Sequence, residues 1–406
     1  MVGVMTLLIV GLVFGRKQFA YLEVAPGLYI IEVVTAALLC TTVVGGFVAA
    51  TPVRRAWSKN VMSHLPRPLL LCSGVCLLLA VGKAVTHFAS GGQAAGLQEL
   101  PILVYPAIYP VLVLWMSQRS PSGRRAVLLS LEYAILLFPV YFLVMHATGA
   151  LEMLSLLNRP LWPNNNFVFS TCLLAIVFCR GAYPTWVLLV SSCCALIGIM
   201  LEAERGAFVC LGLAALVLVR RGGHAVQLGA VALAGLVIVA AFGEQLSYRF
   251  EGGLDDAASF FSSIAGGSDD PRYSSTEQRR EMWSQVVEDV GAAPDTLLIG
   301  KPLSTSIVAE AWRNPHNGYV SALGRGGVFG LLFYLTLLVD ATWALWMSQR
   351  DLGYPLCHLL YFCGCVDALT QTVFDSPYSL FLVICAGACS VIVRAQHPQP
   401  VAEGGV

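Results

Sequence analysis

Three short polar stretches in a strongly apolar chain carry side chains that could do chemistry. The stretch LEAERGAF contains Arg205, QRREMW contains Arg279 and Arg280, and NPHNGY contains His316 and Asn317. An arginine side chain presents five N–H donors in a planar fork that fits phosphate oxygens. A neutral imidazole, whose ordinary pKa is about 6.5, can accept a proton from a hydroxyl group. These residue types indicate phosphate binding beside a general base.

Each stretch also has a purely structural interpretation. Arg205 would fit a solvated turn that Gly206 allows to close, although a charge well inside a membrane span costs about 2.5 to 3.5 kcal/mol. Arg279 would fit a packing role in which its aliphatic stem covers Trp283. An isolated histidine such as His316 more often forms hydrogen bonds than transfers protons. Both interpretations remain open for all three residues.

The composition indicates which elements must position these side chains. The chain of 406 residues is 57% hydrophobic and 12% charged, with a mean hydropathy of +0.73, unlike a soluble domain. Continuous apolar runs of about 20 residues predict helices, which satisfy their own backbone groups in hydrocarbon. We expect an all-helical polytopic membrane protein with about 12 transmembrane helices in a single integral membrane domain, residues 1–406. The expected spans lie near residues 2–14, 27–50, 68–88, 100–116, 126–149, 164–179, 183–202, 205–219, 224–242, 319–347, 352–374 and 378–395.

Lysine and arginine clusters in the short loops predict the orientation, because positive segments are retained in the cytoplasm. The clusters fall on one side of a twelve-span arrangement, and they contain Arg54, Arg55, Lys59, Arg119, Arg124, Arg125, Arg220 and Arg221. We therefore expect both termini in the cytoplasm. Arg16 and Lys17 fall on the opposite side, so a displaced or re-entrant first segment stays open.

This orientation places one long insertion, residues 243–317, on the far face between spans nine and ten. Half of the chain's 24 acidic residues lie in it. Ser274 precedes Glu277 by three residues, the spacing of a capping box, and Gly291 provides a stop. The insertion is thus predicted to be a partly helical loop.

The two arginines of this predicted helix lie on different faces. Arg279 shares a face with Trp283, Val286 and Val290, at steps of 4, 7 and 11 residues. Arg280 lies about 100 degrees around the helix. We expect Arg279 to point toward the apolar face and Arg280 to meet a carboxylate in solvent.

Other polar residues lie in or beside apolar runs. Asp367, within the eleventh span, and Asp375, at its far end, could orient His316, contact sugar, or pair with another span. Three further charged residues are predicted to form interhelical contacts or to extend to the membrane–water interface: Lys83, Glu132 and Asp340.

Several functional classes lack their signatures in this chain. There is no phosphate-binding P-loop, dinucleotide fingerprint, internal repeat or basic stripe. The thirteen cysteines lie in or beside apolar spans, with no flanking histidine cluster. We expect no nucleic-acid partner, no cofactor, no metal and no disulfide.

The order of these motifs resembles the O-antigen ligase and polymerase superfamily of bacterial inner membranes. Arg205 in a short turn, RREMW in the long loop and HNGY before the next span carry the resemblance. The stretch NRPLWPNNNF, residues 158–167, is similar to the Arg and Pro-Asn element of that family and contains Arg159. The resemblance covers residues 155–375. It implies a GT-C-like glycosyltransferase in the bacterial inner membrane, with its active site facing the periplasm.

Loop lengths favour one branch of the superfamily. Ligases move finished polysaccharide from undecaprenyl pyrophosphate to the lipid A core, whereas polymerases extend the chain on undecaprenyl pyrophosphate. Polymerases tend to have two sizeable periplasmic loops. Here the connection formed by residues 150–162 is short, and only the loop of residues 243–317 is long. We expect an O-antigen ligase, with a polymerase as the alternative. A flippase or transporter would show inverted repeats and helices broken near the midplane, and the sequence shows neither.

The resemblance and the compartment together imply a mechanism. The periplasm holds no nucleotide sugars, so the donor must bring its own leaving group, a lipid pyrophosphate. No D-x-D motif is present. Arg205 and Arg279 would neutralise the leaving group in place of a metal, and the family motifs add Arg159 and Arg280 to the pyrophosphate-binding residues.

The remaining predicted site residues would act on the acceptor sugar. His316 would take the proton from an acceptor sugar hydroxyl, giving a single displacement with inversion at the anomeric carbon. Asn317, Asp367 and Asp375 would orient that histidine or contact sugar. The expected partners are the undecaprenyl pyrophosphate-linked glycan, the lipid A core and membrane lipids.

Overall fold

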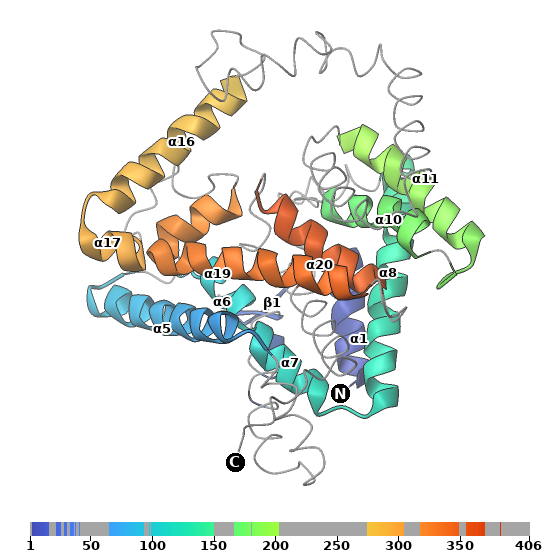
Figure 1. Ribbon diagram of the computed structural model, residues 1–406, viewed down its shortest axis with the longest axis horizontal. Coiled ribbons are helices and arrows are strands. Elements are labelled where there is room, and N and C mark those ends of the chain that lie inside the picture. Colours follow the sequence, from blue (N-terminus) through green and yellow to red (C-terminus); the bar gives the residue numbers. More distant parts are fainter. Residues whose placement is uncertain are drawn as a thin grey trace, which may run out of the picture.

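The fold is built from helices that surround an apolar core (Figure 1). The computed structural model describes residues 2–15, 22–25, 28–30, 33–35, 37, 40, 65–92, 97, 99–149, 166–179, 181–202, 274–303, 317–348, 355–369 and 382. Its helices are α1 (Val2–Val10), α5 (Arg67–Ala89), α6 (Pro101–Ala107), α7 (Tyr109–Ser117), α8 (Pro121–Ala147), α10 (Asn166–Phe178), α11 (Thr185–Glu202), α16 (Ser274–Gly291), α17 (Pro294–Ile299), α19 (Gly318–Ser348) and α20 (Pro355–Asp367). The predicted helical class is confirmed, with one small addition. A π-helical turn (Gly11–Gly15) follows α1, and β1 (Glu23–Ala25) pairs antiparallel with β2 (Leu28–Tyr29).

Three of these helices are long and apolar enough to cross a membrane: α5, α8 and residues Gly318–Trp346 of α19. The chain is therefore a membrane protein with several spans. Shorter apolar helices occupy other expected spans. The expected spans 205–219 and 224–242 lie outside the described residues. One expected span, 100–116, is instead two helices, because the chain turns at Ile108, which lies between Pro106 and Pro110.

Helix α5 shows the pattern expected of a helix between a protein core and lipid. Its buried residues recur at steps of three and four along one face: Leu69, Ser73, Cys76, Ala80, Lys83 and His87. Its exposed apolar residues lie on the rest of the surface and include Leu71, Leu78, Val81 and Val85. The polar side chains Lys83 and His87 thus face the protein interior, where they can be hydrogen-bonded, and the apolar side chains face outward.

Helix α19 is the longest described helix and is broken near its beginning. Gly327 has φ 60° and ψ −153°, a conformation open essentially to glycine alone. The sequence indicated no helix broken near the midplane, and this break lies instead near the beginning of the span. Figure 1 shows α19 beside α5 over part of its length and extending past α5 toward α8, which runs across the direction of both. Helix α8 instead packs against α1, α10, α11 and α20.

The long insertion contains two helices in its described part. Helix α16 begins at Ser274 and ends at Gly291, as the capping-box spacing predicted. Helix α17 follows after two residues, and the Thr296 hydroxyl donates to the carbonyls of Val290 and Ala293, 2.9 Å from each. Both helices contact α19. The insertion therefore packs onto the helical body through this corner.

Candidate functional site

The structure describes only part of the site predicted from the sequence. Asn317 and Asp367 are described with their side chains. Arg279 and Arg280 lie on α16, and their side chains are outside the described part. The other predicted residues lie outside the described residues altogether, and they are Arg159, Arg205, His316 and Asp375. The described part of the site therefore consists of Asn317, Asp367 and the helices next to them.

Asn317 begins α19 as a side-chain cap. Its Oδ1 accepts hydrogen bonds from the backbone N–H of Tyr319 at 2.9 Å and of Val320 at 3.0 Å. Its Nδ2 donates to the carbonyl of Leu369 at 2.8 Å. The first N–H groups of a helix have no partner within the helix, so this cap satisfies two of them. Asn317, the residue after His316, thereby fixes the start of the helix at Gly318.

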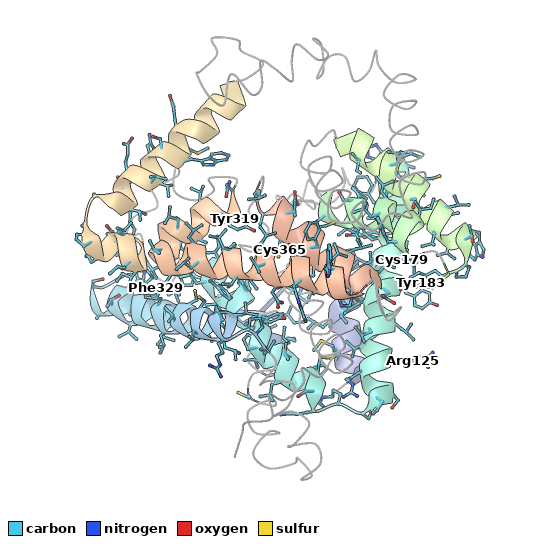
Figure 2. The ribbon with its side chains drawn as sticks, viewed as in Figure 1. Arg125, Cys179, Tyr183, Tyr319, Phe329 and Cys365 are labelled. Carbon is cyan, nitrogen blue, oxygen red and sulfur yellow. The ribbon has the colours of Figure 1, made fainter. Side chains whose placement is uncertain are left out.

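The beginning of α19 is joined to the end of α20. Gly318 N–H donates to the carbonyl of Ala368 at 2.7 Å, and the Tyr319 hydroxyl donates to the carbonyl of Cys365 at 3.0 Å. Figure 2 shows Tyr319 and Cys365 close together on these two helices. We call this contact, made by residues 317–319 with residues 365–369, the α19–α20 junction.

Asp367 lies within the α19–α20 junction. It is fully buried and directly precedes Ala368, whose carbonyl receives the Gly318 N–H. From the sequence, Asp367 was expected to orient His316, contact sugar or pair with another span. The Gly318–Ala368 hydrogen bond brings the backbone next to Asp367 against the first residue of α19. A role for Asp367 toward sugar or imidazole stays a prediction.

Helix α16 presents the predicted face to the protein body. Val286 and Val290 are buried, at 2% and 1% exposure, whereas Val287 between them is 54% exposed. Arg279 precedes Val286 by seven residues, two helical turns, so its position belongs to the buried face. The helix-face prediction is confirmed for the valines. The direction of the Arg279 side chain stays a prediction.

A buried charged group lies where α5, α6, α17 and α19 meet, and the sequence analysis missed most of it. Arg325 pairs with Glu99, Nη1 to Oε2, at 2.6 Å. The ammonium group of Lys83 donates to the carbonyl of Gly300 at 3.2 Å and also to the carbonyl of Lys301. Lys301 N–H in turn donates to the carbonyl of Gly324 at 3.0 Å.

A signal for this group was present in the sequence. Residues 324–327 read GRGG, a charge among small residues inside an apolar run. A charge at that depth needs a partner, and the close backbone approach needs residues without side chains. The partner itself, Glu99, is distant in sequence, so only the folded structure identifies it.

Two further buried acids join helices to one another. Asp340 on α19 accepts hydrogen bonds from the hydroxyls of Tyr109 at 2.8 Å and Tyr361 at 3.4 Å. The two tyrosine rings stack with their centroids 6.1 Å apart. The interhelical contact predicted for Asp340 is confirmed, because these tyrosines come from α7 and α20.

Glu132 makes an equivalent connection from α8. Its carboxyl group, 2% exposed, interacts with the Tyr183 hydroxyl and with the backbone N–H groups of Leu356 and Cys357 in the first turn of α20. A carboxylate is favoured at a helix N-terminus, where backbone donors are unpaired. Glu132 thus ties α8 to α20, as predicted.

Comparison with protein-family models and with curated proteins finds no match to this chain. Within the described ranges, His, Cys, Asp and Glu do not gather in groups of three that could hold a metal ion. The absence of a metal from the reaction stays an expectation from the sequence.

Replacing Asn317 is expected to weaken the α19–α20 junction. Asn317→Ala should lower the free energy of unfolding by about 1 to 3 kcal/mol, because a helix cap and the half-buried hydrogen bond to Leu369 are both lost. Asn317→Ser retains a capping oxygen but cannot reach Leu369, so it should fall between Ala and the natural residue. Unfolding of the detergent-solubilised protein by a denaturing detergent measures the order. Equal stability of Asn317→Ala and the natural protein would contradict the capping role.

Proposed function

We propose that the protein is an O-antigen ligase that transfers polysaccharide from undecaprenyl pyrophosphate to the lipid A core oligosaccharide in lipopolysaccharide biosynthesis. The observation that carries the proposal is the α19–α20 junction. It holds the residue that follows His316 against the end of α20, which bears Asp367. A base in that position would start a membrane span, where a lipid-linked donor and a lipid-anchored acceptor can meet.

The proposed reaction is a single displacement. The acceptor hydroxyl oxygen attacks the anomeric carbon of the donor while His316 accepts the hydroxyl proton. The bond from the anomeric carbon to the pyrophosphate oxygen breaks, and the configuration inverts. Undecaprenyl pyrophosphate leaves with the bonding electrons. Its growing negative charge is neutralised by Arg205 and Arg279, assisted by Arg159 and Arg280.

The proposed setting is the bacterial inner membrane, with the site on the periplasmic face. A GT-C-like arrangement of about 12 spans would place residues 243–317 on that face. Three apolar helices of spanning length support the membrane location. The contact of α16 and α17 with α19 supports a site shared between the insertion and the spans.

The lipopolysaccharide of a deletion strain tests this function. A ligase deletion should remove all long chains from the core while polymer accumulates on the lipid carrier. A core bearing a single repeat would instead indicate a polymerase of the same superfamily. Complementation with the natural chain must restore the long chains, or the strain carries another defect.

One structural feature favours a flippase or transporter as a second candidate. Transporters use broken helices, and α19 is broken at Gly327 beside the buried Arg325–Glu99 pair. The break lies nine residues after Gly318, within the first third of the 29-residue span, rather than at its middle. Purified protein in detergent separates the two functions, because a ligase joins glycan to acceptor without a sealed membrane and a flippase cannot.

The two arginines of α16 are expected to differ. Arg279→Ala should weaken donor binding and lower transfer by a factor of about 10² to 10³, because a charge-assisted contact to the leaving group is lost. Arg279→Lys should recover only part of the activity, since the planar fork is missing. Arg280→Ala should be milder. Transfer rates and binding of the lipid pyrophosphate by the three variants measure these differences. A larger defect in Arg280→Ala than in Arg279→Ala would show that the helix face assigned to the site is wrong.

Transfer is expected to continue in the presence of EDTA, because arginines supply the positive charge in this mechanism. Purified protein would be assayed with donor and acceptor, with and without the chelator. A metal-dependent glycosyltransferase treated in parallel shows that chelation is complete. Complete loss of transfer in EDTA, restored by magnesium or manganese, would rule the arginine mechanism out.

A further inference from the structure

Helix α17 carries an apolar surface that the predicted position of the insertion does not explain. Leu297, Leu298 and Ile299 follow one another and are 43%, 50% and 42% exposed. Contact of such side chains with water is unfavourable in proportion to their exposed apolar area. A loop helix lying wholly in the aqueous phase would not be expected to expose all three.

The contacts of α17 place its end beside two membrane spans rather than above them. Its last turn leads to Gly300, whose carbonyl accepts from Lys83 of α5. Lys83 precedes the last residue of α5, Ala89, by six residues, about 9 Å of helix. The end of α17 therefore lies one to two helical turns inside the limits of α5.

Helix α19 also contacts the end of α17. A Cβ atom on Gly327 would overlap the backbone of Leu298 and Ile299, so the two chains touch at that level. A Cβ atom on Gly300 would lie 2.5 Å from the carbonyl carbon of Arg325. Gly327 is nine residues after Gly318 and is the residue at which α19 is broken.

Exposed apolar side chains also lie on the two spans that meet α17. On α5 the exposed residues near the same end are Val81, Val85 and Phe88, at 62%, 62% and 52%. On α19, Phe329 is 36% exposed, and Figure 2 shows it where α17, α5 and α19 come together. The surface is thus shared by three helices, two of which are long and apolar enough to span a membrane.

Two of the charged residues near α17, Lys301 and Asp295, flank its apolar residues on either side in the sequence. Lys301 pairs with Asp289 of α16. Asp295 lies in the first turn of α17, away from the apolar end. The polar residues can then remain in the headgroup region or in water while the apolar end enters the acyl chains.

We propose that α17 is a membrane-contacting helix whose apolar surface, Leu297–Ile299, is covered by the acyl chains of the leaflet at the Ala89 end of α5. The insertion is then bound to the bilayer surface and does not lie free above it. This proposal concerns lipid contact alone and does not depend on the glycan-transfer function.

Lipid quenching of a site-specific fluorophore tests the proposal. A fluorescent amino acid is introduced at Leu298 by codon suppression, and at Leu297 in a second protein in case the first fails to fold. Each protein is placed singly in nanodiscs of phosphatidylcholine with nitroxide-labelled lipid. Matched labels at Leu78, which faces outward from α5, and at Glu288, which is exposed on α16, serve as controls.

A nitroxide near the headgroup should quench the label at residue 298 or 297 strongly, and the label at Leu78 should respond most to a nitroxide deeper in the chains. The label at Glu288 should retain its fluorescence. Fluorescence at 298 and 297 that matches Glu288, while Leu78 is quenched, would overturn the proposal. Shielding of residue 298 from water-soluble quencher only when two copies share a nanodisc would overturn it too, in favour of an interface between copies.

Discussion

His316→Ala is expected to lower the rate of glycan transfer by a factor of about 10² to 10⁴, the usual contribution of a general base. Donor binding should change little, because the imidazole acts on the acceptor hydroxyl and not on the pyrophosphate. Asn317 caps the helix that follows with its own side chain, so the loss of the imidazole leaves that cap intact. Transfer by membrane-inserted variants at matched expression, beside binding of a lipid pyrophosphate donor, measures both quantities.

A second histidine provides the control for this experiment. His146 lies at the end of α8, and its ring stacks on Phe142 with the centroids 6.3 Å apart. The predicted topology places it on the same face of the membrane as His316. His146→Ala should retain nearly full activity. Equal losses in the two variants, or full transfer by His316→Ala, would remove His316 from the mechanism.

Gly327→Ala is expected to lower the free energy of unfolding by about 3 kcal/mol or more. The φ of 60° with ψ of −153° is unfavourable for any residue that has a Cβ atom. The new methyl group would also overlap the backbone of Leu298 and Ile299, which cannot move without displacing α17. Resistance of the purified protein to unfolding by a denaturing detergent gives the measurement.

Gly82 on α5 provides the matched substitution. It is an exposed helical glycine, and a Cβ atom there would meet nothing within 4 Å. Gly82→Ala should leave the stability unchanged or raise it by up to about 1 kcal/mol, since alanine favours the helix. If Gly327→Ala and Gly82→Ala behaved alike, the break in α19 would not depend on glycine.

The parts of the fold that depend on local sequence were predictable. Ser274, Glu277 and Gly291 predicted both ends of α16, and the spacing of Val286 and Val290 predicted its buried face. The spans α5, α8 and α19 followed from apolar runs of sufficient length. These features are fixed by neighbours along the chain, which the sequence displays directly.

The parts that depend on distant contacts were not predictable. At the break, Gly327 leaves room for the backbone of Leu298, a residue of the insertion that is distant in the sequence. In the site, the sequence marked Asn317, but its partner Leu369 lies 52 residues away. The Arg325–Glu99 pair escaped notice for the same reason, because nothing in either segment specifies the other.

The way Lys83 holds the insertion has a consequence for how this protein can diversify. Its ammonium group binds the main-chain carbonyls of Gly300 and Lys301, which every amino acid possesses. The attachment therefore does not depend on the side chain of Lys301, provided that the close approaches at Gly300 and Gly327 are kept. Substitutions at the exposed positions of α16 and α17 could accumulate without loss of this contact to the helices beneath.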